Sequence, residues 1–188
     1  MAYNAFQKLK DNISAIRIAL QWDKKSRISA TDIATLQKYS GFGGIKAVLY
    51  PPTTQEDWVK LGATDIDLRL FPGILELHEL LQNHLDEKQY REAVQSVKNS
   101  VLTAFYTPDI VPRTLYSILK EQGIEPKRIY EPSAGSGVFI TEAEKAFPQL
   151  EQVTAVEKDR LTGLVLSALN SGLSIKVKTH ISGLEDTP

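Results

Sequence analysis

Two glycines and a carboxylate stand close together in the stretch "YEPSAGSGVFI", residues 130–140. Gly135 and Gly137 have no Cβ, so the backbone of this turn can approach a ligand, or another part of the protein, closely. A turn that follows a strand and precedes a helix lies at the carboxyl end of a parallel sheet, where such units bind ligands. The sequence therefore predicts a binding site at this turn.

Phosphate binding by the turn is disfavoured. No segment has the G-x-x-x-x-G-K-[ST] spacing of a P-loop. The dinucleotide pattern G-x-G-x-x-G is half present, but Ile140 stands where its third glycine would let the helix pack close to the strand. A nicotinamide cofactor remains the weaker alternative.

Two acids indicate a different ligand. Glu157 follows Gly137 by twenty residues at the end of a predicted strand, a spacing typical of a carboxylate that binds two ribose hydroxyls. Glu131 precedes the turn, where it would repel a pyrophosphate and attract an ammonium or sulfonium group. A ribose joined to a positively charged amino-acid end describes S-adenosylmethionine.

Composition restricts the other chemistry. The 188 residues are 42% hydrophobic and 24% charged, with a formal net charge of −1, as in a folded globular protein. The absence of cysteine excludes disulfides and thiolate chemistry, and His78, His84 and His180 do not have a metal-ligand spacing. We expect no metal, no membrane association and a cytoplasmic location, because no segment resembles a signal peptide or a membrane span.

The elements that position these residues change in type near residue 125. Before it, apolar periodicity and capping residues predict helices over residues 6–20, 29–39, 86–102 and 107–123. Ser29 or Thr31 would cap the second helix, with Gly41 after it, while Thr107 and Gly123 would bound the fourth. After residue 125, strands at 128–132, 152–159 and 174–181 alternate with helices, which predicts a parallel sheet.

Several segments resemble a known family. "YEPSAGSGVF" resembles the S-adenosylmethionine motif of DNA adenine-N6 methyltransferases. "TAFYTPDIVPRTL" is similar to the segment before that motif, and "AVEKD" to the ribose-binding acid. "YSGFGGIKAVLYP" resembles the N-terminal part of methyltransferase–helicase proteins of bacterial mobile elements. The resemblance implies an α/β fold, with a helical N-terminal region (1–102) followed by the first half of a Rossmann-like methyltransferase domain (103–188).

The resemblance also implies roles for individual residues. The residues that would flank the methionine end of the cofactor are Tyr106, Thr107 and Pro108. Those that would line its amino-acid and sulfonium portion are Glu131, Ser133, Gly135 and Gly137. Phe139 would lie near the adenine, Glu157 would bind the ribose, and Lys158 and Asp159 would border the adenine pocket. Taken singly, Phe139 could be a core residue, Thr107 a helix cap and Glu157 a solvated strand end.

The catalytic motif of that family, [Asn/Asp/Ser]-Pro-Pro-[aromatic], is not found. The pair Pro51-Pro52 is flanked by Tyr50 and Thr53, which predicts a loop. The resemblance thus implies a fragment of a longer bacterial enzyme that is inactive alone, has no catalytic residue of its own and meets DNA through the full-length protein. RNA, protein or small-molecule substrates stay open. A non-catalytic DNA- or protein-binding module with this fold is the alternative.

Three further features carry expectations. Without a fourth strand, one edge of the first strand would be bare, so we expect self-association or an N-terminal helix covering that edge. Six basic residues between 8 and 27 could bind phosphates, but a solvated helix face is the favoured interpretation: Lys8, Lys10, Arg17, Lys24, Lys25 and Arg27. The segment "GFGGIK" predicts a flexible turn between helices.

Overall fold

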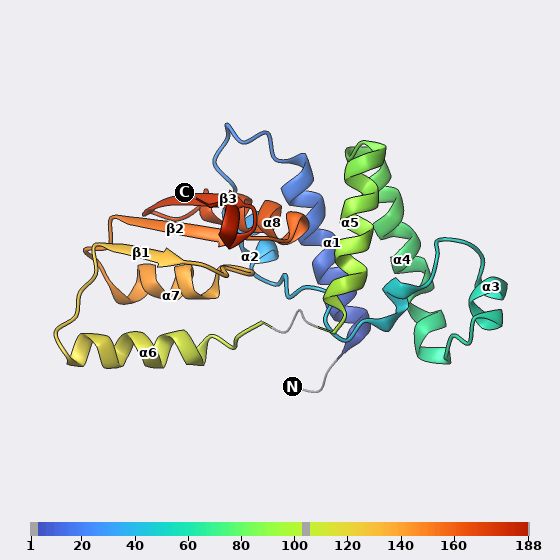
Figure 1. Cartoon of the computed structure of the whole chain (residues 1–188), viewed down its shortest axis with the longest axis horizontal. Coiled ribbons are helices and arrows are strands. Elements are labelled where there is room, and N and C mark those ends of the chain that lie inside the picture. The colour runs from blue at the N-terminus through green and yellow to red at the C-terminus, as the bar shows by residue number, and fades with distance from the viewer. Residues whose placement is uncertain (1–3, 103–105, 188) are drawn as a thin grey trace.

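The computed structural model describes residues 4–102 and 106–187 and has an α/β fold (Figure 1). The N-terminal region is helical, with α1 (Ala5–Gln21), α2 (Ala30–Leu36), the 3-10 helix η1 (Lys46–Leu49), α3 (Gln55–Lys60), α4 (Asp65–His84) and α5 (Glu87–Ser100). The remainder alternates helices and strands, with α6 (Ile110–Glu121), β1 (Arg128–Glu131), α7 (Val138–Ala146), β2 (Gln152–Glu157), α8 (Arg160–Asn170), β3 (Lys176–Ile181) and the 3-10 helix η2 (Leu184–Asp186).

Local capping explains where several helices begin. The Ser29 side chain accepts a hydrogen bond from the Asp32 N–H, so Ser29 and not Thr31 caps α2. The predicted start of the fourth helix at Thr107 is wrong. Helix α6 begins at Ile110. Residues 106–108 are not helical, and Asp109 is the residue at the cap position. Gly123 follows the end of α6 with a φ of 71°, as a helix-terminating glycine does.

The long helix α4 was not among the predicted helices. Pro72 lies inside it, and an internal proline normally argues against a helix because it removes one backbone hydrogen bond. A capping box between Thr64 and Asp67 fixes its start, and Ile74, Leu77 and other side chains of one face are buried. Packing against α1 and η1 therefore outweighs the local cost of the proline.

The sheet has three parallel strands in the order β1-β2-β3. Its register aligns Ile129, Val153 and Val177 on the face that α7 and α8 cover. The next residues along the strands, including Tyr130 and Thr154, face the other way. Among the described strands β1 pairs only with β2, so it is an edge strand.

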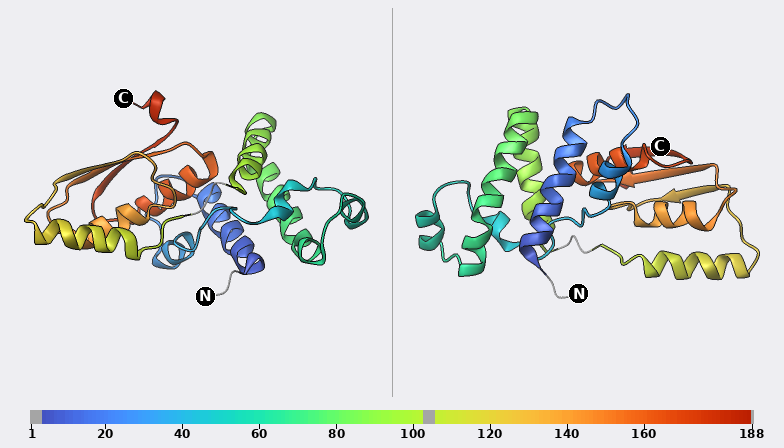
Figure 2. Two further views of the ribbon diagram at one scale, coloured as in Figure 1. Left: turned by 60° about the horizontal axis from the view of Figure 1, so that its bottom comes forward. Right: turned by 180° about the vertical axis from the view of Figure 1, so that it is seen from behind.

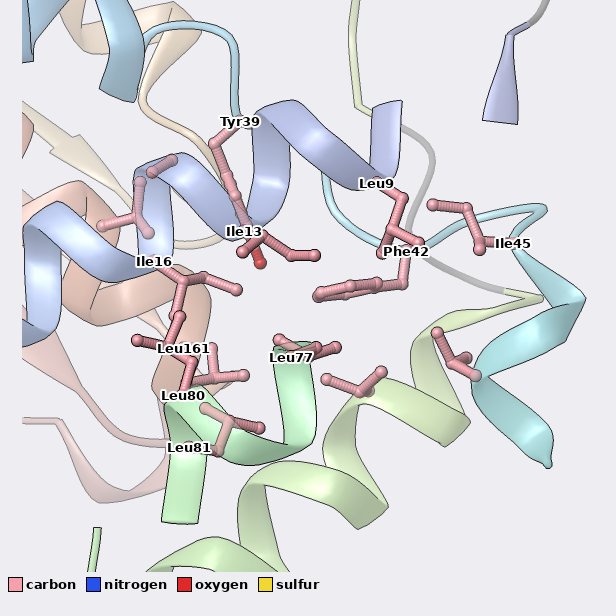
Figure 3. Close-up of a cluster of buried hydrophobic side chains, with 14 of the residues drawn as sticks. Leu9, Ile13, Ile16, Tyr39, Phe42, Ile45, Leu77, Leu80, Leu81 and Leu161 are labelled. Atoms are coloured by element: carbon pink, nitrogen blue, oxygen red, sulfur yellow. The ribbon is translucent and has the colours of Figure 1, made fainter. Parts of the chain in front are cut away.

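One hydrophobic cluster joins the helical region to the sheet region. Leu161, Val165 and Leu169 of α8 are buried together with side chains of α1, α2, α4 and α5. Figure 3 shows Leu161 beside Ile16 of α1, and Figure 2 shows α1 between the sheet and the pair α4–α5. The N-terminal helices thus pack on α8, whereas one of them was expected as a possible cover for the β1 edge. The predicted division at residue 102 separates two regions that share a core.

None of the helices in the described ranges is both long enough and apolar enough to cross a lipid bilayer.

Candidate functional site

A cavity of about 390 Å³ lies between the helical region and the carboxyl end of β2. This volume is within the range of small-molecule sites in proteins. Both parts of the chain line it, with Tyr39, Gly41, Phe42, Ser96, Val97, Asn99 and Ser100 on one side and Tyr106, Glu157, Lys158, Asp159 and Thr162 on the other. The cavity therefore depends on the packing of α5 and the 39–42 segment against the sheet region.

Glu157, the last residue of β2, presents an oriented carboxylate to this cavity. Its Oε2 accepts a hydrogen bond from the Gly135 N–H at 2.9 Å, and its Oε1 accepts one from the Asp159 N–H at 2.7 Å. Burial raises the pKa of Glu157. Because each carboxylate oxygen has two lone pairs, both can accept a further hydrogen bond from a ligand. The Gly-Ser-Gly turn and the acid are thus one hydrogen-bonded unit.

The ring of Tyr106 lies between two glycines from distant parts of the chain. A Cβ on Gly41 would stand 2.7 Å from a ring carbon of Tyr106, and a Cβ on Gly135 would stand 2.9 Å from another. Both glycines have positive φ, 66° and 54°, which other residues rarely adopt. The close approach that Gly135 permits is therefore made by Tyr106 in this structure.

Two tyrosine hydroxyls meet at Thr162 on α8. The hydroxyls of Tyr39 and Tyr106 lie 3.0 and 3.1 Å from the Thr162 Oγ1. Burial raises the pKa of Tyr106 to about 12 and that of Tyr39 well above its usual value. Tyrosine is already neutral near pH 7, and the raised pKa values keep both phenols neutral hydrogen-bonding groups at alkaline pH as well.

Helix α5 is linked directly to the residues after β2. The Ser96 hydroxyl donates a hydrogen bond to Oδ2 of Asp159, while Oδ1 of Asp159 accepts one from the Thr162 N–H and caps α8. Lys158 points outward, and its Nζ lies 3.4 Å from a Glu185 carboxylate oxygen. The α5 contact therefore holds the loop that follows Glu157.

The segment expected to be a flexible turn is largely buried and is held by hydrogen bonds. The side chain of the buried Asn12 donates to the Gly41 carbonyl at 2.6 Å and accepts from the Ser40 N–H at 3.0 Å. Lys8 donates to the Gly43 carbonyl at 2.9 Å, and the Gly44 N–H donates to the Val101 carbonyl. These bonds fix the position of Gly41 against Tyr106.

The structure brings together four of the ten predicted cofactor residues: Tyr106, Gly135, Glu157 and Lys158. Thr107 and Pro108 are exposed and lie outside the cavity lining. Glu131 turns toward its own loop, where its Oε1 accepts a hydrogen bond from the Ser133 N–H at 3.1 Å. Thr107, Pro108, Glu131 and Ser133 therefore do not line the cavity.

The remaining two predicted residues have packing partners in a second hydrophobic cluster, which lies between the sheet and helices α6, α7 and α8. A Cβ on Gly137 would stand 2.8 Å from a methyl group of Leu166, so this glycine allows the turn to pack on α8. The Phe139 ring contacts Tyr116 of α6 edge-on, with 6.3 Å between centroids. Neither lines the cavity, and a role for either in cofactor binding stays a prediction.

The residues of the helical wall of the cavity were not among the predicted site residues. Tyr39 and Gly41 belong to the "YSGFGG" segment, whose glycines were the available signal. Ser96, Asn99 and Ser100 carry no such signal, because their position depends on how α5 packs against the sheet region.

Among the six N-terminal basic residues, the side chains of Lys8 and Arg17 make contacts with other parts of the chain. Lys8 binds the Gly43 carbonyl, and Arg17 forms an ion pair with Glu76 at 2.7 Å. The segment containing Pro51 is a loop, as predicted, and its Pro51 carbonyl accepts a hydrogen bond from the Trp58 indole. No group of three or more potential metal ligands occurs within residues 4–102 and 106–187.

Comparison with known proteins identifies one informative relative. Over 65 residues, the chain is 48% identical to the Type II methyltransferase M.XamI of Xanthomonas campestris pv. amaranthicola. A 65-residue segment of the chain is therefore similar to part of a methyltransferase. The match covers 35% of this chain and 12% of the relative, so it spans about an eighth of that enzyme. No family model matches the chain, and no solved structure matches it.

Proposed function

We propose that this chain forms the cofactor-binding part of an S-adenosylmethionine-dependent DNA adenine-N6 methyltransferase. The observation that carries the proposal is the Glu157 carboxylate, which two backbone N–H groups orient at the wall of a ligand-sized cavity. A vicinal diol donates two hydrogen bonds to one carboxylate, and ribose is the diol that such an acid binds at the end of a second strand.

The charges around the turn support the same ligand. Glu131 and Glu157 both lie at the carboxyl end of the sheet, where they would repel phosphate groups and attract the ammonium and sulfonium of S-adenosylmethionine. The relative named above is a methyltransferase, which also supports this cofactor class. When bound, the cofactor would supply an activated methyl group.

Transfer to adenine requires more than this chain's cavity. The target base must leave the DNA stack and be held in a pocket, and positioning contributes most of the rate. We assign no residue of this chain to that step. In the proposed enzyme, Glu157 and the turn would hold the cofactor, while base recognition would depend on other segments.

The test is isothermal titration of the whole chain with S-adenosylmethionine, with NAD as the comparison ligand. We expect binding of the former only. Glu157→Gln should weaken the binding of S-adenosylmethionine by about tenfold or more, because a neutral amide accepts hydrogen bonds from the diol less strongly than a carboxylate does. The matched control is Glu151→Gln, an exposed acid that directly precedes the same strand.

Two results would contradict the proposal. One is a folded chain that does not bind S-adenosylmethionine. The other is DNA affinity that falls steeply with salt and is unaffected by the cofactor, which would favour the non-catalytic binding module instead.

A further inference from the structure

The helical region supplies about half of the cavity lining, although it precedes the predicted cofactor motifs in the sequence. Four of these residues lie in the C-terminal part of helix α5: Ser96, Val97, Asn99 and Ser100. Phe42, on the 39–42 segment, also lines the cavity, and Figure 3 shows its ring among the buried side chains of the hydrophobic cluster, near Leu77 of α4. A ligand bound at Glu157 would therefore have α5 as a neighbour.

The distance between α5 and Glu157 is set by a direct contact. Ser96 on α5 donates a hydrogen bond to Asp159, and Asp159 donates its backbone N–H to Glu157. The α5 wall is thus two hydrogen bonds away from the carboxylate that would hold a ribose. A nucleoside whose diol binds Glu157 could not extend into the cavity without meeting this wall.

The charges of the cavity indicate which end of the ligand faces α5. Two acids line it, Glu157 and Asp159, and Lys158 is the one basic residue among its described lining residues. The Lys158 side chain is 80% exposed and lies 3.4 Å from Glu185. The four lining residues on α5 carry no charge, so this wall offers no ionic partner to either the ammonium or the carboxylate of the methionine end. A neutral planar base suits a wall of apolar side chains, hydroxyls and an amide.

We propose that α5 forms the wall that contacts the base of the bound nucleoside, so that the helical region is a structural half of the cofactor site. This inference rests on the proposed function and adds a location for each end of the cofactor. The base lies against α5, and the methionine end extends toward the turn that contains Glu131 and Ser133. The helical region then does more than support the sheet, because its side chains contact the base of the bound nucleoside.

Substitutions that narrow the cavity on its α5 side test this inference. Isothermal titration measures the binding of two ligands to each variant. The variants are Ser100→Phe and Asn99→Trp, both of which add bulk at lining positions. The ligands are S-adenosylmethionine and 5′-methylthioadenosine, which lacks the amino-acid end. We expect each variant to weaken both ligands by the same factor, about tenfold or more, because the added ring displaces the base.

Asn99 is exposed, so Asn99→Trp should fold even if Ser100→Phe does not, and the inference can then still be tested. The matched control is Glu92→Trp, an exposed position on α5 that does not line the cavity, and it should leave both affinities unchanged. Circular dichroism and thermal melting establish that each variant is folded.

The outcomes separate this inference from the proposed function. If the unmodified chain binds S-adenosylmethionine, Glu157→Gln weakens binding by about tenfold or more and the α5 variants bind normally, the α5 inference is overturned while the proposed function stands. If the variants weaken S-adenosylmethionine but not 5′-methylthioadenosine, the methionine end faces α5, and the proposed orientation is wrong. If the unmodified chain binds neither ligand, the proposed function itself fails.

Discussion

The Tyr106 ring lies against the backbone of Gly135, with a ring carbon 2.9 Å from the point where a Cβ would stand. The same ring is held on its other side by Gly41, and its hydroxyl lies 3.1 Å from Thr162. Tyr106 therefore cannot move aside to make room for a larger residue at 135. This contact joins the glycine turn of the sheet region to the helical region.

The first prediction concerns this contact. Gly135→Ala should lower the free energy of unfolding by about 3 kcal/mol, since it combines a strained positive φ with a collision against Tyr106. Gly62→Ala is the matched control, because Gly62 has a φ of 86° and no atom lies within 4 Å of the point where its Cβ would stand. Gly62→Ala should lower the free energy of unfolding by only about 1 kcal/mol. Urea denaturation measures the free energy of unfolding of both variants. Equal decreases would show that Tyr106 does not constrain position 135.

A second prediction concerns the buried Asn12. Asn12→Ala should lower the free energy of unfolding by about 2–3 kcal/mol, because it leaves the Gly41 carbonyl and the Ser40 N–H without their partner. Asn83→Ala, at an exposed position on α4, should change it by less than about 0.5 kcal/mol. Denaturation curves of the two variants give the comparison. A small effect at Asn12 would mean that water replaces its hydrogen bonds.

Binding of a nucleoside should depend on pH through Glu157. The ionised carboxylate accepts hydrogen bonds from the diol, and burial raises the pKa of Glu157. As the pH is lowered, affinity should therefore begin to fall at a higher pH than for a glutamate with its usual pKa. Titration with 5′-methylthioadenosine between pH 8 and pH 5 measures this decline. Glu157→Gln should bind weakly with no such decline, and a decline that persists in this variant would assign the titration to another group.

The edge of β1 gives a fourth prediction. The unpaired backbone of an edge strand can pair with another chain, and the Tyr130 side chain beside it is 50% exposed. We expect the chain to self-associate with rising concentration, as light scattering coupled to size-exclusion chromatography would detect. Tyr130→Lys should reduce the association by charge repulsion, whereas Leu61→Lys, at another exposed position, should not. A monomer at all concentrations would exclude association through this edge.

The sheet region could be predicted from the sequence more fully than the helical region. Apolar strands, β-branched residues and Gly-Ser-Gly spacing are local signals, and they placed β1, β2 and β3 within about two residues of their bounds. Helix α4 was missed because Pro72 is a local argument against a helix that tertiary packing overrides. Thr107 resembled a cap locally, yet α6 begins at Ile110.

Some residues of the candidate site could likewise be predicted from the sequence, and others could not. Glu157 could be predicted because its distance from the turn in sequence is characteristic, and the structure places it at a cavity wall. The partners of the glycines could not be predicted. Gly135 packs on Tyr106 and Gly137 on Leu166, and both contacts arise from the way the helices pack. A glycine pattern indicates a close approach but does not identify what approaches.

Helix α8 has two apolar faces. Leu161 and Leu169 are buried among the N-terminal helices, while Leu166 belongs to the cluster beneath the sheet. Residues 103–188 expressed by themselves would expose the first of these faces to water, which favours aggregation over a soluble small domain. The two parts should accordingly melt in a single cooperative transition. The unit that can be moved into another protein, crystallised or evolved as a block is thus larger than the segment containing the cofactor motifs.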